Sequence, residues 1–164
     1  MTNFPLRYIP KRLNKKDTRK IKKELNLSRK LYKRGKYYTR KKVRSFKSKP
    51  SKHIVHARKI YGIKNIAPTN ELANKTGCSV NTLKKIVSKG EGAYFSSGSR
   101  PNQTAQSWGI ARLASALTSG KSAAIDYNIL HSGCKRGSKG YKSGENARKK
   151  YGYGKRKVPK VLVK

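Results

Sequence analysis

Residues 70–90, NELANKTGCSVNTLKKIVSKG, have the spacing of a helix-turn-helix pair. Ala73 is small enough to let two helices approach, and Gly77 follows four residues later, where the turn needs a left-handed backbone. The core positions of the second helix recur at helical intervals: Val80, Leu83 and Ile86. Ser79 is suited to begin this helix and Gly90 to end it. The stretch therefore predicts two short packed helices.

This pattern reports how two helices pack, and two interpretations of its function stay open. If the second helix reads DNA, its polar residues face the major groove: Ser79, Asn81, Thr82, Lys84 and Lys85. In the alternative, the pair is purely architectural.

Two more helices are expected downstream. Thr104 is suited to cap the first and Gly120 to end it, and its apolar stripe consists of Ile110, Leu113, Ala114 and Leu117. Residues 122–133, SAAIDYNILHSG, repeat the same pattern. The centre of the chain, from about residue 69 to 131, is therefore predicted to be all helical.

The charge of the chain is large and unevenly spread. Its 43 Lys and Arg residues against 6 Asp and Glu residues give a formal net charge of +37. Residues 1–65 hold 24 basic and 2 acidic residues, residues 66–134 hold 7 and 3, and residues 135–164 hold 12 and 1. A chain this cationic repels itself unless a polyanion or an acidic surface neutralises it.

These numbers predict three parts. Residues 1–65 form a basic N-terminal arm with short helices, residues 66–134 a small helical domain, and residues 135–164 a basic tail rich in Gly, Lys and Tyr. The expected fold class is mainly α, with the helix-turn-helix-like pair flanked by extended basic arms. In the N-terminal arm, one helix is expected after Asp17 or Thr18 and a second between Ser51 and Gly62.

Aromatic rings alternate with cations in both arms. The rings predicted to contact a partner there are Tyr37, Tyr38, Phe46, Tyr151 and Tyr153. The arms either lie extended over a partner or are solvated and disordered. The C-terminal residues 158–164, VPKVLVK, are apolar enough to add a strand to the edge of a neighbour's sheet.

Residues 92–117 contrast with the arms because they hold two charged residues and the one Trp of the chain. The rings predicted to serve packing and protein contact here are Tyr94, Phe95 and Trp108. Ser97, Ser99 and Arg100 precede a helix N-terminus, an arrangement that favours anion binding. The alternative is a well-ordered loop whose Arg100 is bonded to carbonyl groups.

No catalytic constellation is recognised. The hydroxyls of the loop lack a general base, and the acids Glu91 and Asp126 are single. His53 and His56 lie one helical turn apart without a third ligand nearby. We therefore expect no enzyme activity, no metal, no cofactor and no small-molecule substrate.

The expected compartment follows from hydropathy, the N-terminal sequence and the cysteines. No apolar run is long enough to span a membrane, and the N-terminus has no secretory signal pattern. Cys78 and Cys134 stand alone, without metal-ligand spacing, and are expected to stay reduced thiols in the cytosol.

Three runs carry a resemblance: RYIPKRLNKKDTRKIKKELNLSRKLYKRGKYYTRKKVRSFKSKPSKHIVHARKIYGI, TGCSVNTLKKIVSKG and GEGAYFSSGSRPNQTAQSWGIARLASALTSGKSAAIDYNIL. Residues 7 to about 134 resemble an uncharacterised small basic domain family of large double-stranded DNA viruses of algae and protists, like the virion proteins of chloroviruses and other phycodnaviruses. The run SGSRPNQT…SWGIAR is its most specific part. The resemblance implies no reaction. It implies a virus with a capsid and a genome to package.

Two functions compete in that context. The first is a minor capsid protein whose basic arms lace between other capsid proteins or along the inner shell, located in the virion and, during assembly, in the host cytoplasm. The second is a DNA-binding protein that condenses or reads viral DNA. The expected partners are thus capsid proteins, or viral DNA or another polyanion.

Overall fold

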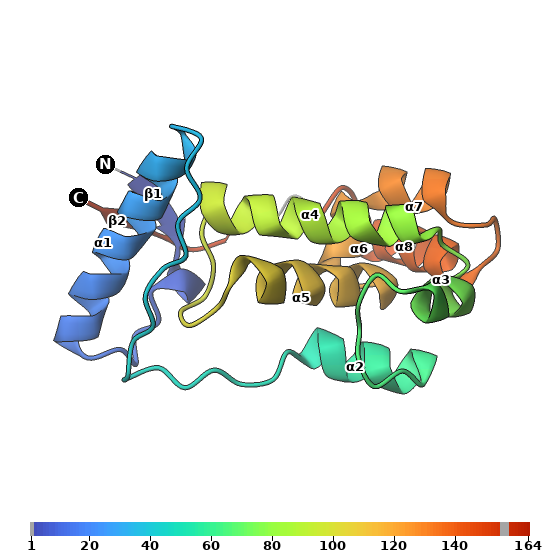
Figure 1. The fold of residues 1–164 in the computed structure, drawn as a ribbon, viewed down its shortest axis with the longest axis horizontal. Coiled ribbons are helices and arrows are strands. Elements are labelled where there is room, and N and C mark those ends of the chain that lie inside the picture. The colour runs from blue at the N-terminus through green and yellow to red at the C-terminus, as the bar shows by residue number, and fades with distance from the viewer. Residues whose placement is uncertain (1, 155–157) are drawn as a thin grey trace. The chain divides into compact units, whose positions relative to one another are not determined.

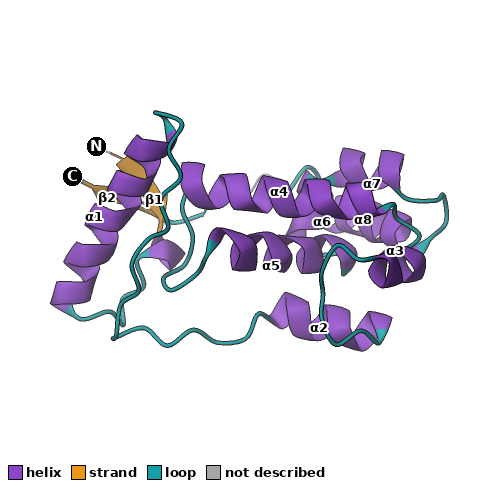
Figure 2. Ribbon diagram, in the orientation of Figure 1, coloured by secondary structure: helices purple, strands orange, loops and turns teal. Residues whose placement is uncertain are grey.

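The computed structural model describes residues 2–154 and 158–164, and it is mainly helical, as predicted (Figures 1 and 2). Its elements, in chain order, are β1 (Thr2–Pro5), the 3-10 helix η1 (Leu6–Tyr8), α1 (Lys15–Tyr32), α2 (Lys52–Tyr61), α3 (Asn70–Thr76), α4 (Val80–Ser96), α5 (Ala105–Leu117), α6 (Lys121–Ile125), α7 (Tyr127–Gly133), α8 (Lys139–Tyr151) and β2 (Lys160–Val163).

The chain divides into two units. Unit 1 consists of Met1–Lys49, Glu91–Trp108 and Lys157–Lys164, and unit 2 consists of Pro50–Gly90 and Gly109–Arg156. These units differ from the predicted parts, whose boundaries followed residues 65 and 134. Both segments predicted as arms are folded, because each end of the chain packs on residues distant in the sequence.

In unit 1, α1 packs beside a two-stranded antiparallel sheet of β1 and β2 (Figure 1). Ile21 and Leu25 of α1 are buried with Phe4 of β1 and Val163 of β2. The C-terminal residues thus form the strand that the sequence predicted. Its partner is a strand of this chain, and the register pairs Thr2 with Val163.

Helix α1 begins three or four residues earlier than predicted. Its cap is Asn14, whose side-chain oxygen accepts a hydrogen bond from the backbone N–H of Asp17 at 2.7 Å. Asp17 does not cap the helix because its carboxylate bonds Ser45 instead.

In unit 2, α3, α4 and the turn between them lie where the sequence predicted two helices and a turn. Gly77 has a left-handed backbone with φ +76°, and Leu83 and Ile86 are fully buried. The hydroxyl oxygen of Ser79 accepts a hydrogen bond from the backbone N–H of Thr82. The pattern thus located the turn and two core positions, while Val80, the third, is partly buried and packs against the same core.

The prediction that α4 ends at Gly90 is wrong, because the helix continues to Ser96. Gly90 lies where α4 meets α5. A Cβ atom at this position would be 2.6 Å from the Cα of Gly109. Gly90 therefore permits a close helix contact and does not terminate the helix.

The single helix predicted over residues 122–133 is broken at Asp126, which separates α6 from α7. The Asp126 carboxylate is buried and accepts two hydrogen bonds from Arg112 and one from Lys89, all at 2.8 Å. It therefore ties α4 and α5 to the junction of α6 and α7. These three residues are far apart in the sequence, so no local sequence pattern predicts the contacts between them.

Helix α8 lies within the segment predicted to be a tail. Gly140, Gly144 and Ala147 are buried on one side of it. A Cβ atom at Gly140 would overlap the Sγ atom of Cys78, and one at Gly144 would touch Leu130. Small residues at helical spacing thus form a face that packs closely. The segment was not predicted as a packed helix because this face has no large apolar side chains.

The expectation of reduced thiols is also wrong for this structure, in which Cys78 and Cys134 form a disulfide. Two backbone hydrogen bonds flank it: Ser79 N–H donates to the carbonyl of Gly133, and Lys135 N–H donates to that of Gly77. The disulfide joins the turn between α3 and α4 to the residue after α7. A separation of 56 residues kept this pairing out of reach of sequence spacing.

Alanine substitutions at two left-handed glycines of unit 2 test the turn. Gly137→Ala meets open space and should cost only the backbone penalty of about 1–2 kcal/mol. At Gly77, a new Cβ would lie 2.3 Å from the Cβ of Ser138, the N-cap of α8. Gly77→Ala should therefore lower the free energy of unfolding by about 1 kcal/mol more than Gly137→Ala. Urea unfolding followed by circular dichroism measures both, and equal losses would contradict this packing.

Candidate nucleic-acid interface

Residues 36–49, the basic segment, lie extended beside α1 and are bonded to it by two buried carboxylates. Glu24 accepts from the backbone N–H of Lys41 at 2.8 Å and from the hydroxyl of Tyr38. Asp17 accepts from both the backbone N–H and the hydroxyl of Ser45, at 2.8 and 2.6 Å. The sequence left this segment as either disordered or laid over a partner, and it is laid over its own helix.

The spacing of these bonds fits a helix beside an extended strand. Asp17 and Glu24 are seven residues apart, about 10 Å along a helix. Lys41 and Ser45 are four residues apart, about 13 Å along an extended chain. Two carboxylates on one side of α1 therefore match two amides of a segment that runs in the opposite direction.

Arg40 points inward from the basic segment. Its guanidinium donates to the hydroxyl of Ser28 at 2.9 Å, to the carbonyl of Tyr94 at 2.8 Å and to the hydroxyl of Ser99 at 2.7 Å. It also lies over the Tyr94 ring, 3.7 Å from the centroid. Burial lowers the pKa of the Arg40 guanidinium below its ordinary value. This side chain is an internal support of the segment.

Asn102 holds the other end of the basic segment. Its side chain accepts from the N–H of Val43 at 2.8 Å and donates to the carbonyls of Val43 and Phe46. Arg40, Val43 and Phe46 are all buried, so every third residue turns inward. The cations between them are left on the outside.

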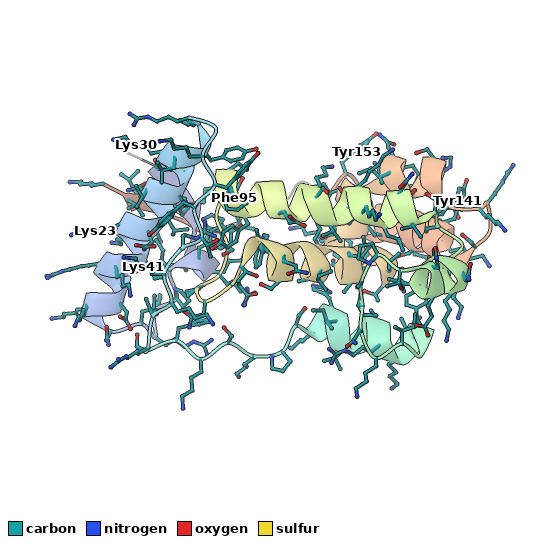
Figure 3. The ribbon with its side chains drawn as sticks, in the orientation of Figure 1. Lys23, Lys30, Lys41, Phe95, Tyr141 and Tyr153 are labelled. Atoms are coloured by element: carbon teal, nitrogen blue, oxygen red, sulfur yellow. A yellow bond between two sulfur atoms is a disulfide. The ribbon has the colours of Figure 1, made fainter. Side chains whose placement is uncertain are left out.

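We call the exposed cations of α1 and the following residues to 49 the basic surface. Its members are Lys15, Lys16, Arg19, Lys23, Lys30, Lys33, Arg34, Lys36, Lys41, Lys42, Arg44, Lys47 and Lys49. Figure 3 marks Lys23 and Lys30 on α1 and Lys41 on the segment beside it. Residues 15–49 contain 17 basic and 2 acidic residues, a net charge of +15, and both acids are buried. The surface is thus strongly cationic and held on a folded support.

Three rings cluster where α1, the basic segment and α4 meet. We call Tyr32, Tyr37 and Phe95 the aromatic platform. Tyr32 and Phe95 are nearly parallel, with 6.4 Å between centroids, and Tyr37 lies 5.1 Å from Phe95. Tyr37 is 74% exposed.

The groove-facing residues predicted on α4 divide into two groups. Asn81, Lys84 and Lys85 are exposed, whereas Thr82 is buried, so the prediction for Thr82 is wrong. The hydroxyl of Thr82 bonds Ser79 and the carbonyl of Gly133. Thr82 was misplaced because residues at the end of α7, distant in the sequence, cover that side of α4.

The predicted anion loop is only partly available. Ser97 and Arg100 are exposed, but Ser99 is buried and accepts a hydrogen bond from Arg40. Ser99 therefore cannot serve a bound anion as predicted. Thr104 caps α5, as expected, by accepting from the N–H of Ser107.

The aromatic residues predicted to contact a partner also divide. Tyr94 and Phe46 are buried, so neither ring is open to a partner, and this prediction is wrong for both. Phe46 alternates with cations in the sequence, which concealed that it lies on the inner side of the basic segment. Tyr94 lies in α4, under the guanidinium of Arg40. Trp108 packs edge-on against Tyr8, and Tyr151 packs on the core of unit 2.

The remaining rings keep an accessible side. Tyr37 and Tyr153 are 74% and 73% exposed, and Phe95 is half-buried. The hydroxyl of Tyr38 donates a hydrogen bond to the carboxylate of Glu24. Burial, together with this carboxylate, raises the pKa of Tyr38 above its ordinary value.

A family model described as a family of unknown function, DUF5824, matches residues 5–132. The chain belongs to this family. The match contains the whole basic surface and the aromatic platform, and it ends before Cys134, α8 and β2, which complete the two units. No curated protein and no solved structure matches the chain. Membership of DUF5824 therefore indicates neither a reaction nor a partner.

Residues 2–154 and 158–164 also bear on metal binding and on membrane spanning. No three His, Cys, Asp or Glu side chains in these ranges gather as ligands of a metal would. Of the helices described, none combines the length and apolar character needed to cross a bilayer.

At low pH, protonation of Asp17 should weaken the attachment of the basic segment to α1. Its bonds to the hydroxyl and N–H of Ser45 lower the pKa of Asp17 below its ordinary value of about 4. The stability that this carboxylate contributes is fully present above that value and is lost as the pH falls through the lowered pKa. Asp17→Asn should therefore show a shallower loss of stability below about pH 4 than the wild type.

Unfolding in urea at a series of pH values measures this difference. Glu71→Gln, a change at an exposed acid of α3, should keep the wild-type slope. Parallel curves for Asp17→Asn and the wild type would contradict a role for Asp17 in acid sensitivity.

Proposed function

We propose that this chain is a non-enzymatic nucleic-acid-binding protein that contacts phosphates with its basic surface. The observation that supports this proposal most strongly is the placement of charge in residues 15–49. Asp17 and Glu24 are buried as hydrogen-bond acceptors, while the cations around them are exposed. A surface arranged in this way carries positive charge without the acids that would neutralise it.

The physical basis of binding is the release of counterions. Each Lys or Arg that neutralises a phosphate frees condensed cations, so affinity falls steeply with salt and depends little on sequence. The basic surface consists mostly of lysines, which are flexible point charges suited to phosphate contact and not to bidentate base reading. The proposed binding is therefore general for nucleic acid.

A minor capsid protein is a second proposal, supported by the viral context that the resemblance implies through the motif in residues 97–112. In it, the basic surface would face acidic patches of other capsid proteins. The lacing of free arms is no longer part of that proposal, because α1, the basic segment, α8 and β2 are folded onto the chain. Nucleic acid is the partner that better matches an exposed cationic surface on a folded support.

Sequence-specific reading by α4 is not part of the proposal. Asn81, Lys84 and Lys85 are exposed, and they can add phosphate contacts. The first turn of α4, however, is bonded to residues near Gly133 through Ser79 and Thr82. In a helix-turn-helix reader, that end of the helix contacts the bases.

Replacing three labelled lysines tests the role of the basic surface. The triple variant Lys23→Gln, Lys30→Gln and Lys41→Gln should bind duplex DNA more weakly, because it removes three phosphate-neutralising charges. The slope of log affinity against log salt should decrease by up to about 3. The matched control replaces the same residues with Arg, and it should keep both affinity and slope.

Fluorescence anisotropy at several salt concentrations measures these constants on the full chain. Equal slopes for the Gln and Arg variants would place the binding charges elsewhere. Absence of binding to any nucleic acid at low salt would contradict the proposed function and leave acidic protein surfaces as the partner.

A further inference from the structure

The aromatic platform lies inside the basic surface. Tyr32 ends α1, Tyr37 follows in the basic segment, and Phe95 lies in the last turn of α4. Figure 3 shows Phe95 at the C-terminal end of α4 and Lys30 near the C-terminal end of α1. Three elements of unit 1 thus bring three rings together, and the rings lie 5.1–6.4 Å apart.

The inner side of the platform is held rigidly. Phe95 makes an edge-on contact with Tyr94, with 5.1 Å between the ring centroids. Tyr94 is fully buried, its hydroxyl accepts the N–H of Arg40, and its ring lies under the Arg40 guanidinium. The support beneath Phe95 is therefore fixed by hydrogen bonds and packing.

The outer side of the platform is open and cationic. Tyr37 keeps 74% of its surface exposed although its ring contacts both Tyr32 and Phe95. The neighbouring cations are exposed as well: Lys30, Lys33, Arg34 and Lys36. An exposed ring on a rigid aromatic support, next to phosphate-binding charges, is the arrangement with which proteins stack unpaired bases.

We propose that the aromatic platform binds single-stranded nucleic acid by stacking on its bases, an inference that rests on the proposed function. In a duplex, the faces of the bases are covered by their neighbours in the stack. Rings outside the helix can reach them only at unpaired nucleotides. The platform therefore gives the basic surface a preference for single strands over duplexes.

The experiment compares the full-length chain on two probes, a labelled oligothymidylate of about 16 nucleotides and the same strand annealed to its complement. Fluorescence anisotropy at one fixed salt concentration gives each affinity. The wild type should prefer the single strand. Tyr37→Ala should weaken single-strand binding about fivefold or more and leave duplex binding within about twofold.

Two control variants separate stacking from other effects. Tyr37→Phe keeps the ring and should retain wild-type affinity for the single strand. Tyr153→Ala removes an equally exposed ring in unit 2, at 73% exposure, and should leave the preference for single strands unchanged. Circular dichroism checks that each variant is folded, and the high exposure of both tyrosines makes folding defects small.

The outcomes distinguish this inference from the function on which it rests. Wild-type affinity of Tyr37→Ala for the single strand, or equal binding of both probes by the wild type, would overturn the stacking site and leave phosphate binding intact. Loss of binding in Tyr37→Phe would overturn it as well. Absence of binding to both probes would overturn the proposed function together with this inference.

Discussion

The basic surface depends on the hydrogen bonds that Asp17 and Glu24 accept from the basic segment. Residues 15–49 have a net charge of +15, and mutual repulsion opposes holding so many cations on one helix and its neighbouring strand. Two buried carboxylates oppose this repulsion from within. Each accepts one backbone N–H and one hydroxyl of the segment, and neither engages a lysine side chain of it.

In unit 2, the buried carboxylate of Asp126 also holds separate parts of the chain together. Asp126 is buried and joins Arg112 and Lys89, which connects α4, α5 and the junction of α6 and α7. The chain has six acidic residues, and three of them are buried. These three acids are engaged in hydrogen bonds and ion pairs within the fold, so few carboxylates lie exposed among the surface cations. The exposed charge is therefore mostly positive, as binding of a polyanion requires.

The sequence predicted what local patterns encode. The spacing of Ala73, Gly77 and Leu83 located two helices and the turn between them, because these contacts lie within twenty residues of one another. Local patterns could not predict the position of the basic segment or the disulfide. The contacts of Lys41 with Glu24 and of Cys78 with Cys134 join residues that only the folded chain brings together. For the candidate site, the pattern predicted a set of contact rings, of which Tyr37 is exposed and Phe95 partly buried, but it could not show that Tyr94 and Phe46 are buried.

Hydrogen exchange of the backbone amides in residues 36–49 tests the account most directly. The amides of Lys41, Val43 and Ser45 are hydrogen bonded to side chains of α1 and the 97–104 loop. We expect them to exchange far more slowly than in an unstructured peptide. In the variant Asp17→Ala, Glu24→Ala, which removes both acceptors, the amides of Lys41 and Ser45 should lose this protection while α4 keeps its own. Exchange at the unstructured rate in the wild type would contradict an ordered basic surface.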